Sequence, residues 1–154
     1  MTVYVSMLRG VNVGGNKVKM TELRDMYMKI GARNVETYIQ SGNVVFDTDQ
    51  NEADMASRIE SIFADTFGFE TAVIMRTEQD MNRIVDNMPF AGVDTDKLHV
   101  TFLSAVPEIF PHDDFSNARQ PEEKFANAKR EIYVYCPRGY GRTKLNNNLI
   151  EKKL

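Results

Sequence analysis

The strongest helix signal in this 154-residue chain is the stretch Asn51-Glu-Ala-Asp-Met-Ala-Ser-Arg-Ile-Glu-Ser-Ile-Phe-Ala-Asp-Thr-Phe-Gly68. Acidic side chains crowd its first turn, where the helix dipole favours negative charge. Asn51 is placed to cap the helix, and Gly68 is placed to end it. One apolar stripe at helical spacing predicts a face that packs on a neighbouring layer. The stripe consists of Met55, Ile59, Ile62, Phe63 and Phe67.

The segments around this helix predict strands and one further helix. Residues 2–8 alternate Val3, Val5 and Met7 with more polar residues, which is the period-two pattern of a half-buried strand. A helix is expected after Thr21. Further β-rich runs are found at 35–40, 43–46 and 71–75, the first two joined by a Ser-Gly turn.

The element order predicts an α+β fold. Residues 1–76 have the order β-α-β-β-α-β, which is the ferredoxin-like arrangement. Residues 77–154 predict a second, smaller α+β half. It begins with a helix capped by Thr77 and Asp80 and ends with a helix over 143–154. No linker-like composition separates the halves, so we expect the second half to pack on the first as one compact unit.

Composition indicates a soluble protein of the cytoplasm. Hydrophobic residues make up 42% and charged residues 27% of the chain, and the apolar runs are far too short to span a membrane. The N-terminus shows no signal peptide. The single cysteine, Cys136, excludes an internal disulfide and fits a reducing compartment. No cofactor motif is present.

The net charge of −3 is unevenly distributed. Residues 1–40 carry six Lys/Arg against three Asp/Glu, residues 41–96 three against twelve, and residues 97–154 ten against seven. The acidic middle argues against a general nucleic-acid-binding protein. A local positive patch is expected only if the two ends of the chain meet in the fold.

A basic glycine-rich loop lies near each end of the chain. The first runs from Arg9 to Lys19 and lacks the spacing of a Walker or dinucleotide motif. Gly14 and Gly15 can form an amide nest for an anion, flanked by Arg9 and Lys17. Ordinary turn chemistry explains the same glycines without a ligand.

The second loop, Arg138-Gly-Tyr-Gly-Arg-Thr-Lys144, is the better anion candidate. Thr143 is a predicted helix N-cap, and Arg142 and Lys144 beside it oppose the helix dipole unless something negative is bound. A nearby carboxylate of the acidic segment is the alternative partner. Gly141 and Thr143 are expected to offer backbone donors.

Three other features are weaker candidates. Gln40, Ser41 and Asn43 form a polar hairpin tip that could approach a ligand or simply form a turn. Tyr4 and Tyr38 could stack bases as in RNA-binding sheets, but coverage by the second half of the chain is the favoured interpretation.

Catalytic and metal chemistry find little support. A lowered pKa of the Cys136 thiol is conceivable near Arg138, but a buried structural cysteine is the preferred interpretation. His99 and His112 are the only histidines, so no histidine-rich metal site can form. We therefore predict no catalytic residues and no metal.

Three motifs together resemble the bacterial family called domain of unknown function 1697. They are Leu8-Arg-Gly-Val-Asn-Val-Gly-Gly15, Tyr38-Ile-Gln-Ser-Gly-Asn-Val-Val-Phe46 and Gly139-Tyr-Gly-Arg-Thr-Lys-Leu145 with Glu151-Lys-Lys-Leu154. The resemblance implies a compact α+β protein of a bacterial cytoplasm, and it implies no activity. The family pattern continues beyond Glu-Lys-Lys-Leu, so a site that needs that segment would be incomplete here.

The leading hypothesis is a binding module for a small phosphate- or carboxylate-bearing ligand, held where the two loops and the hairpin tip converge. The predicted site residues are Arg9, Asn12, Gly14, Gly15, Gln40, Ser41, Asn43, Gly141, Arg142, Thr143 and Lys144. The competing hypothesis is a homodimer or a partner-docking protein whose half-exposed strands and methionines form the interface.

Overall fold

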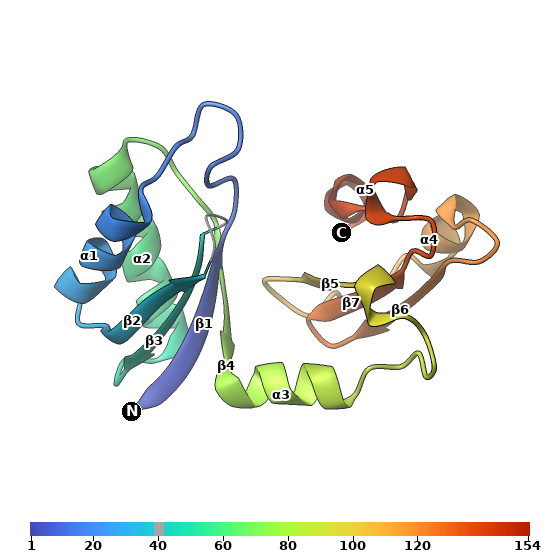
Figure 1. Ribbon diagram of the computed structural model, residues 1–154, viewed down its shortest axis with the longest axis horizontal. Coiled ribbons are helices and arrows are strands. Elements are labelled where there is room, and N and C mark those ends of the chain that lie inside the picture. The colour runs from blue at the N-terminus through green and yellow to red at the C-terminus, as the bar shows by residue number, and fades with distance from the viewer. Residues whose placement is uncertain (39–41) are drawn as a thin grey trace. The chain divides into compact units, whose positions relative to one another are not determined.

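The computed structural model describes residues 1–38 and 42–154. Within this part it has five α-helices and two antiparallel sheets, so the mixed α+β class is confirmed (Figure 1). The chain divides into two compact units, Met1–Arg83 and Ile84–Leu154. The predicted boundary was at residue 76, just before the helix that contains the observed division.

Unit 1 contains a four-stranded sheet in the order β2-β3-β1-β4, with every neighbouring pair antiparallel. Two helices, α1 and α2, pack on the same face of this sheet (Figure 1). The elements are β1 (Thr2–Leu8), α1 (Met20–Lys29), β2 (Arg33–Tyr38), β3 (Asn43–Thr48), α2 (Glu52–Phe67), β4 (Val73–Thr77) and the start of α3 (Glu78–Asp86).

The side of β1 that faces the helices differs from the prediction. Tyr4, Ser6 and Leu8 are buried, whereas Val3 and its alternates lie half-buried on the opposite face. The reason is that Ser6 has a partner in the core: its hydroxyl lies 2.7 Å from the hydroxyl of Tyr27. A polar residue can therefore occupy a core position, and the larger Tyr4 and Leu8 side chains fill the space beside it.

The predicted ends of α2 are confirmed. The side chain of Asn51 accepts a hydrogen bond from the amide of Asp54 at 2.8 Å. Gly68 ends the helix in the left-handed conformation with φ of 79°, and its amide donates to the carbonyl of Ala64 at 3.0 Å. Met55, Ile59 and Phe63 of the predicted stripe are fully buried.

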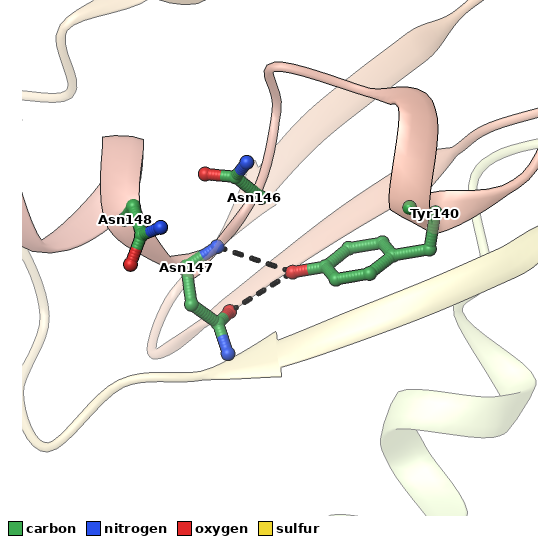
Figure 2. A pocket seen from close by; sticks show the side chains of 5 residues that line it. Tyr140, Asn146, Asn147 and Asn148 are labelled. Carbon is green, nitrogen blue, oxygen red and sulfur yellow. Dashed lines mark hydrogen bonds between the residues drawn. The ribbon is translucent and has the colours of Figure 1, made fainter.

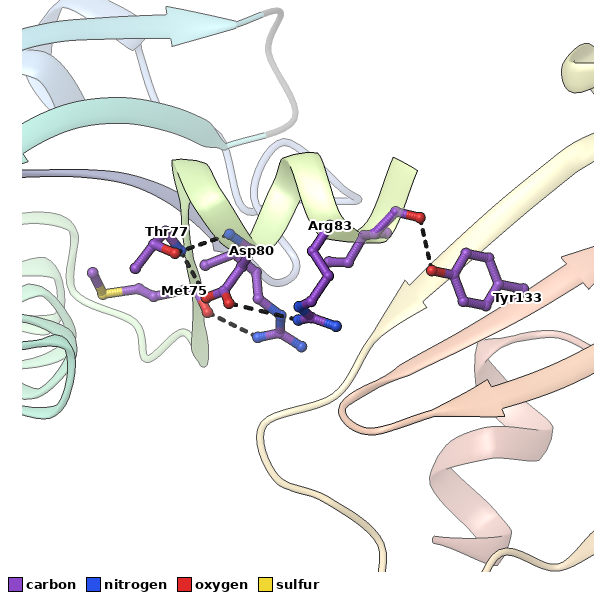
Figure 3. Close-up of polar contacts among 7 residues, drawn as sticks. Met75, Thr77, Asp80, Arg83 and Tyr133 are labelled. Atoms are coloured by element: carbon purple, nitrogen blue, oxygen red, sulfur yellow. Dashed lines mark hydrogen bonds and ion pairs between the residues drawn. The ribbon is translucent and has the colours of Figure 1, made fainter. Parts of the chain in front are cut away.

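The predicted capping box at the start of α3 is also confirmed (Figure 3). Its second member is Asp80, three residues after Thr77, instead of the usual glutamate or glutamine. The Thr77 amide donates to the Asp80 carboxylate at 3.1 Å, and the Asp80 amide donates to the Thr77 hydroxyl at 3.0 Å. Burial acts to raise the pKa of Asp80, but these two Thr77 bonds and the nearby Arg83 together lower it. Asp80 is therefore held in its charged form.

Unit 2 contains a three-stranded antiparallel sheet in the order β5-β7-β6. Its core gathers Phe115, Leu145 and Ile150 on Ile132 and Val134 of the central strand. On the other face of that strand, the buried Tyr133 hydroxyl donates to the Ile84 carbonyl at 2.8 Å (Figure 3). The elements are β5 (Leu98–Phe102), α4 (His112–Ala118), β6 (Lys124–Ala128), β7 (Glu131–Tyr135) and α5 (Asn147–Lys153), with 3₁₀ turns at Thr95–Lys97 and Tyr140–Arg142.

The predicted start of the last helix is wrong. Thr143 ends the short 3₁₀ turn Tyr140–Arg142, and α5 begins at Asn147, four residues later. The Thr143 hydroxyl accepts from the Leu145 amide at 3.0 Å, which holds the chain in a turn. Asn146 is the actual N-cap, because its side chain accepts from the Leu149 amide at 3.1 Å.

Candidate functional site

The first glycine loop is a folded turn anchored at both ends. Val11 and Val18 are buried in the unit 1 core. Between them, Asn12 adopts a positive φ of 57°, and its side-chain oxygen accepts from the Val18 amide at 2.8 Å. Its own amide donates to the Asn16 carbonyl at 2.7 Å. In this structure Asn12 thus holds the loop together, and Gly14 and Gly15 form its exposed tip.

Arg9 leaves β1 with its backbone fixed on both sides. Its amide donates to the Ala72 carbonyl at 3.1 Å, and its carbonyl accepts from the Thr71 hydroxyl at 2.7 Å. The residue as a whole is exposed. The start of the loop is therefore fixed in its backbone.

Gly42, which directly precedes β3, lies against this first loop. Gly42 has a positive φ of 85°, and a Cβ there would meet Leu8 and Val11 at 3.1 to 3.3 Å. The Leu8 amide donates to the Gly42 carbonyl at 3.2 Å, and Asn43 pairs with Met7 across the strands. Asn43 is thereby brought beside the loop, whereas Gln40 and Ser41 lie outside the described residues.

In unit 2, the second loop uses three of its backbone donors internally. The amides of Gly139, Arg142 and Thr143 donate to carbonyls within residues 136–140. Thr143 is buried, so its amide and hydroxyl serve the turn itself. The predicted clash between Arg142, Lys144 and a helix dipole is absent, because neither residue lies in the first turn of α5.

Next to this loop lies an open hollow of about 270 Å³ (Figure 2). The residues that line it are Tyr140, Gly141, Asn146, Asn147 and Asn148. The three consecutive asparagines were not singled out from the sequence. Their run directly after Leu145 was the available signal, since such a run is favoured at a turn or helix cap rather than inside a helix.

The Tyr140 ring on the wall of the hollow is held in place from two directions. The His99 ring lies 4.6 Å away between ring centres. The Tyr140 hydroxyl accepts from the Asn147 amide at 3.1 Å and donates to the Asn147 side-chain oxygen at 3.2 Å (Figure 2). Partial burial raises the pKa of Tyr140, so its hydroxyl keeps the proton that it donates.

The cationic side chains of the second loop are exposed. Arg138, Arg142 and Lys144 all project from the loop surface. Within residues 1–38 and 42–154, none of the three forms an ion pair with a carboxylate. The Gln120 side chain donates to the Arg142 carbonyl at 3.4 Å, which helps to fix the backbone at that position. Exposed positive charge is thus present in the same loop as Tyr140 and Gly141, which line the hollow.

The glycines of the two loops differ in a way that matters for the site. Seven of the nine glycines have positive φ, which other residues rarely adopt. Gly15 and Gly141 do not, and a Cβ at either would meet nothing within 4 Å. The fold of each unit therefore gives no reason for glycine at these two positions.

The structure places the predicted site residues in two groups. Unit 1 holds Arg9, Asn12, Gly14, Gly15 and Asn43 around its loop, and unit 2 holds Gly141, Arg142, Thr143 and Lys144. Because each unit is described by itself, the convergence of the two loops stays a prediction. Each group is a local arrangement with its own geometry.

The structure argues against a reactive cysteine at Cys136 and against nucleobase stacking on Tyr4. Burial raises the pKa of Cys136, with the Thr143 hydroxyl acting in the opposite direction, so the conceivable lowered pKa is wrong. Tyr4 lies on the helix-covered face, 6.0 Å from Phe46 between ring centres, so it cannot stack nucleobases. Its cover is the unit 1 core rather than the second half of the chain.

The described residues show neither a metal cluster nor a membrane-spanning helix. They contain no group of three or more His, Cys, Asp or Glu side chains that could hold a metal ion. None of the helices found there combines the length and the hydropathy required to cross a bilayer.

Comparison with known proteins identifies the family. A family model described as "Protein of unknown function (DUF1697)" matches residues 1–133. The solved structure of the conserved bacterial protein SP0830 from Streptococcus pneumoniae is similar, with 26% identity over 98% of this chain and 86% of that chain and a TM-score of 0.75. A search of curated proteins found no match. Because the family model covers most of the residues, the chain belongs to the DUF1697 family.

Proposed function

We propose that the protein binds a small phosphate- or carboxylate-bearing ligand at the second loop, with Arg142 as its principal partner. The carrying observation is that Arg142 and Lys144 are exposed and have no carboxylate partner in the described part of the chain. Arg142 directly follows Gly141, which lines the hollow together with Tyr140. A guanidinium offers paired donors that match the oxygens of a phosphate or carboxylate.

Gly141 supports the proposal in an independent way. It precedes Arg142 in the loop, yet its backbone and its surroundings both tolerate a side chain. A ligand that approaches the backbone closely would explain why no Cβ is present there. Gly15 has the same properties in the first loop, where Arg9 and Lys17 are exposed, so we extend the proposal to a second, separate anion contact in unit 1.

The test is a titration of inorganic phosphate and pyrophosphate, followed by heteronuclear NMR. Arg142→Ala is expected to weaken binding roughly tenfold or more, since a charge-assisted hydrogen bond contributes roughly 1.5–3 kcal/mol and about 1.4 kcal/mol corresponds to a tenfold change in affinity. Lys124→Ala is the matched control: it removes the same charge from β6, which lies on the opposite edge of the sheet from β5. Equal binding by the wild type and the Arg142→Ala variant would contradict the assignment.

We further propose that unit 1 has the ferredoxin-like topology and that the protein works in a bacterial cytoplasm. The strand order β2-β3-β1-β4 with two helices on one face supports the first point. The similar protein from Streptococcus pneumoniae and the single free cysteine support the second. Localisation of a tagged full chain in its host tests the latter directly.

A second candidate function is partner docking or homodimer formation. The segment between β5 and α4 exposes two large apolar side chains, Val106 at 61% and Ile109 at 84%. Exposed apolar groups of this kind favour contact with another surface. Light scattering at high concentration separates the two functions: a monomer that is unchanged by Ile109→Asp argues against the dimer.

A further inference from the structure

We propose that the ligand of the second loop is a small phosphorylated sugar or a related polyol phosphate. In this assignment Tyr140 and Asn148 contact the hydroxylated ring while Arg142 binds the phosphate. The inference rests on the proposed function of the same site and adds the chemical class of the ligand. It follows from the lining of the hollow, which is neutral, rich in carboxamides and built around one fixed aromatic ring.

The Tyr140 ring is pre-organised as a flat wall. His99 packs 4.6 Å from it, and Thr101 supports the same cluster by donating to the Asn147 side-chain oxygen at 3.3 Å. His99 and Thr101 share one face of the sheet, because they are two residues apart in β5. A ring that is already immobilised loses little conformational freedom when a ligand stacks on it.

The asparagines supply neutral donors and acceptors for hydroxyl groups. The Asn147 oxygen already accepts from Tyr140 and Thr101, so its amino group is left to donate elsewhere. Asn148 is exposed, and its side chain makes no hydrogen bond within the described part of the chain. A carboxamide can donate to one hydroxyl and accept from its neighbour, which fits a vicinal diol.

Three of the first four backbone amides of α5 already have acceptors. The Asn147 amide donates to Tyr140, and the amides of Leu149 and Ile150 donate to Asn146. In this assignment recognition depends mainly on side chains: the Tyr140 ring, the two carboxamides and the guanidinium. Those groups distinguish a sugar phosphate from inorganic phosphate, which would use the guanidinium alone.

The hollow is small and open to solvent. About 270 Å³ is below the range of about 300–1,000 Å³ in which clefts enclose drug-sized molecules. A single sugar ring with one phosphate is a better match than a dinucleotide or a long acyl chain. The hollow is open, so the phosphate of a bound ligand can extend toward the exposed Arg142, which follows the lining residue Gly141.

The experiment compares three probes by NMR titration of the full chain: ribose 5-phosphate, inorganic phosphate and unphosphorylated ribose. We expect ribose 5-phosphate to bind at least tenfold more tightly than inorganic phosphate. Asn148→Ala should weaken ribose 5-phosphate binding about fivefold, the effect of one neutral hydrogen bond, and leave phosphate binding unchanged. Asn117→Ala, an equally exposed asparagine on α4, is the matched control.

The outcomes separate the two proposals. If neither phosphate compound shifts the resonances of residues 138–148, the proposed anion site is overturned and this inference with it. If both bind equally, or if Asn148→Ala behaves like Asn117→Ala with ribose 5-phosphate, only the sugar assignment is overturned. Replacement of Tyr140 by phenylalanine keeps the ring and should retain most of the gain over inorganic phosphate.

Discussion

The hydroxyl groups of Ser6 and Tyr27 lie 2.7 Å apart in the core of unit 1, where both residues are fully buried. This contact ties β1 to α1. Burial raises the pKa of Tyr27 far above its ordinary value, with the Ser6 bond acting weakly against it, so the phenol stays neutral. The pair is a polar link inside an apolar layer.

Removal of either hydroxyl is expected to destabilise unit 1, and loss of the Ser6 hydroxyl should cost more than loss of the Tyr27 hydroxyl. Tyr27→Phe leaves the Ser6 hydroxyl with a second acceptor, the Val44 carbonyl at 3.4 Å, so a loss of about 1 kcal/mol is expected. Ser6→Ala leaves the buried phenol without its Ser6 partner and should cost roughly 1–3 kcal/mol. Urea unfolding of both single variants and the double variant measures the coupling, and equal single losses would contradict this account.

Asn12 is predicted to determine the shape of the first loop. Asn12→Ala removes the acceptor of the Val18 amide and places alanine at φ of 57°, so we expect a loss of about 1–2 kcal/mol. Asn12→Gly removes the same acceptor but accepts the backbone conformation, and it should cost less. Hydrogen exchange of the Val18 amide is the direct readout. Unchanged protection in the alanine variant would show that the side chain does not hold the loop.

Substitution of Gly141 should affect ligand binding without reducing stability. Gly141→Ala should leave stability unchanged or raise it by roughly 0.4–1 kcal/mol, because the position tolerates a Cβ and alanine restricts the unfolded chain. The same variant should bind pyrophosphate several-fold more weakly. Gly139→Ala is the comparison, since its φ of 98° makes alanine strained and destabilising. A Gly141→Ala variant with full affinity would remove this support for the site.

The capping box of α3 predicts a pH dependence of stability. The folded pKa of Asp80 is lowered, so its contribution is fully present above the unfolded value of 3.8 and is lost as the pH falls through the folded value. Thr77→Ala should cost about 1 kcal/mol at pH 7. Because Thr77 supplies the bonds that lower the pKa, the same variant should lose less stability than the wild type between pH 5 and pH 2. Parallel curves in urea titrations would contradict the capping interpretation.

Local signals in the sequence determined the elements and several of their ends. The period-two pattern of β1 and the 3.6-residue stripe of α2 require only neighbouring residues, as do the caps at Asn51, Gly68 and Thr77. Each such signal is a hydrogen bond or a dihedral preference within a few residues. For that reason it could be predicted before any tertiary contact was known.

Tertiary structure decided what depends on distant partners. It selected the Tyr4 and Ser6 face of β1 for the core, because Tyr27, twenty-one residues from Ser6, provides the hydroxyl that makes Ser6 acceptable there. It also placed the start of the last helix at Asn147. There the Asn147 amide donates to the Tyr140 hydroxyl, and the Leu149 amide donates to the Asn146 side chain. The alternating pattern of β1 does not determine which of its two faces is buried. Cap propensity likewise does not determine whether Thr143 or Asn146 begins the last helix. In both cases the structure that forms is the one in which the polar groups have hydrogen-bond partners.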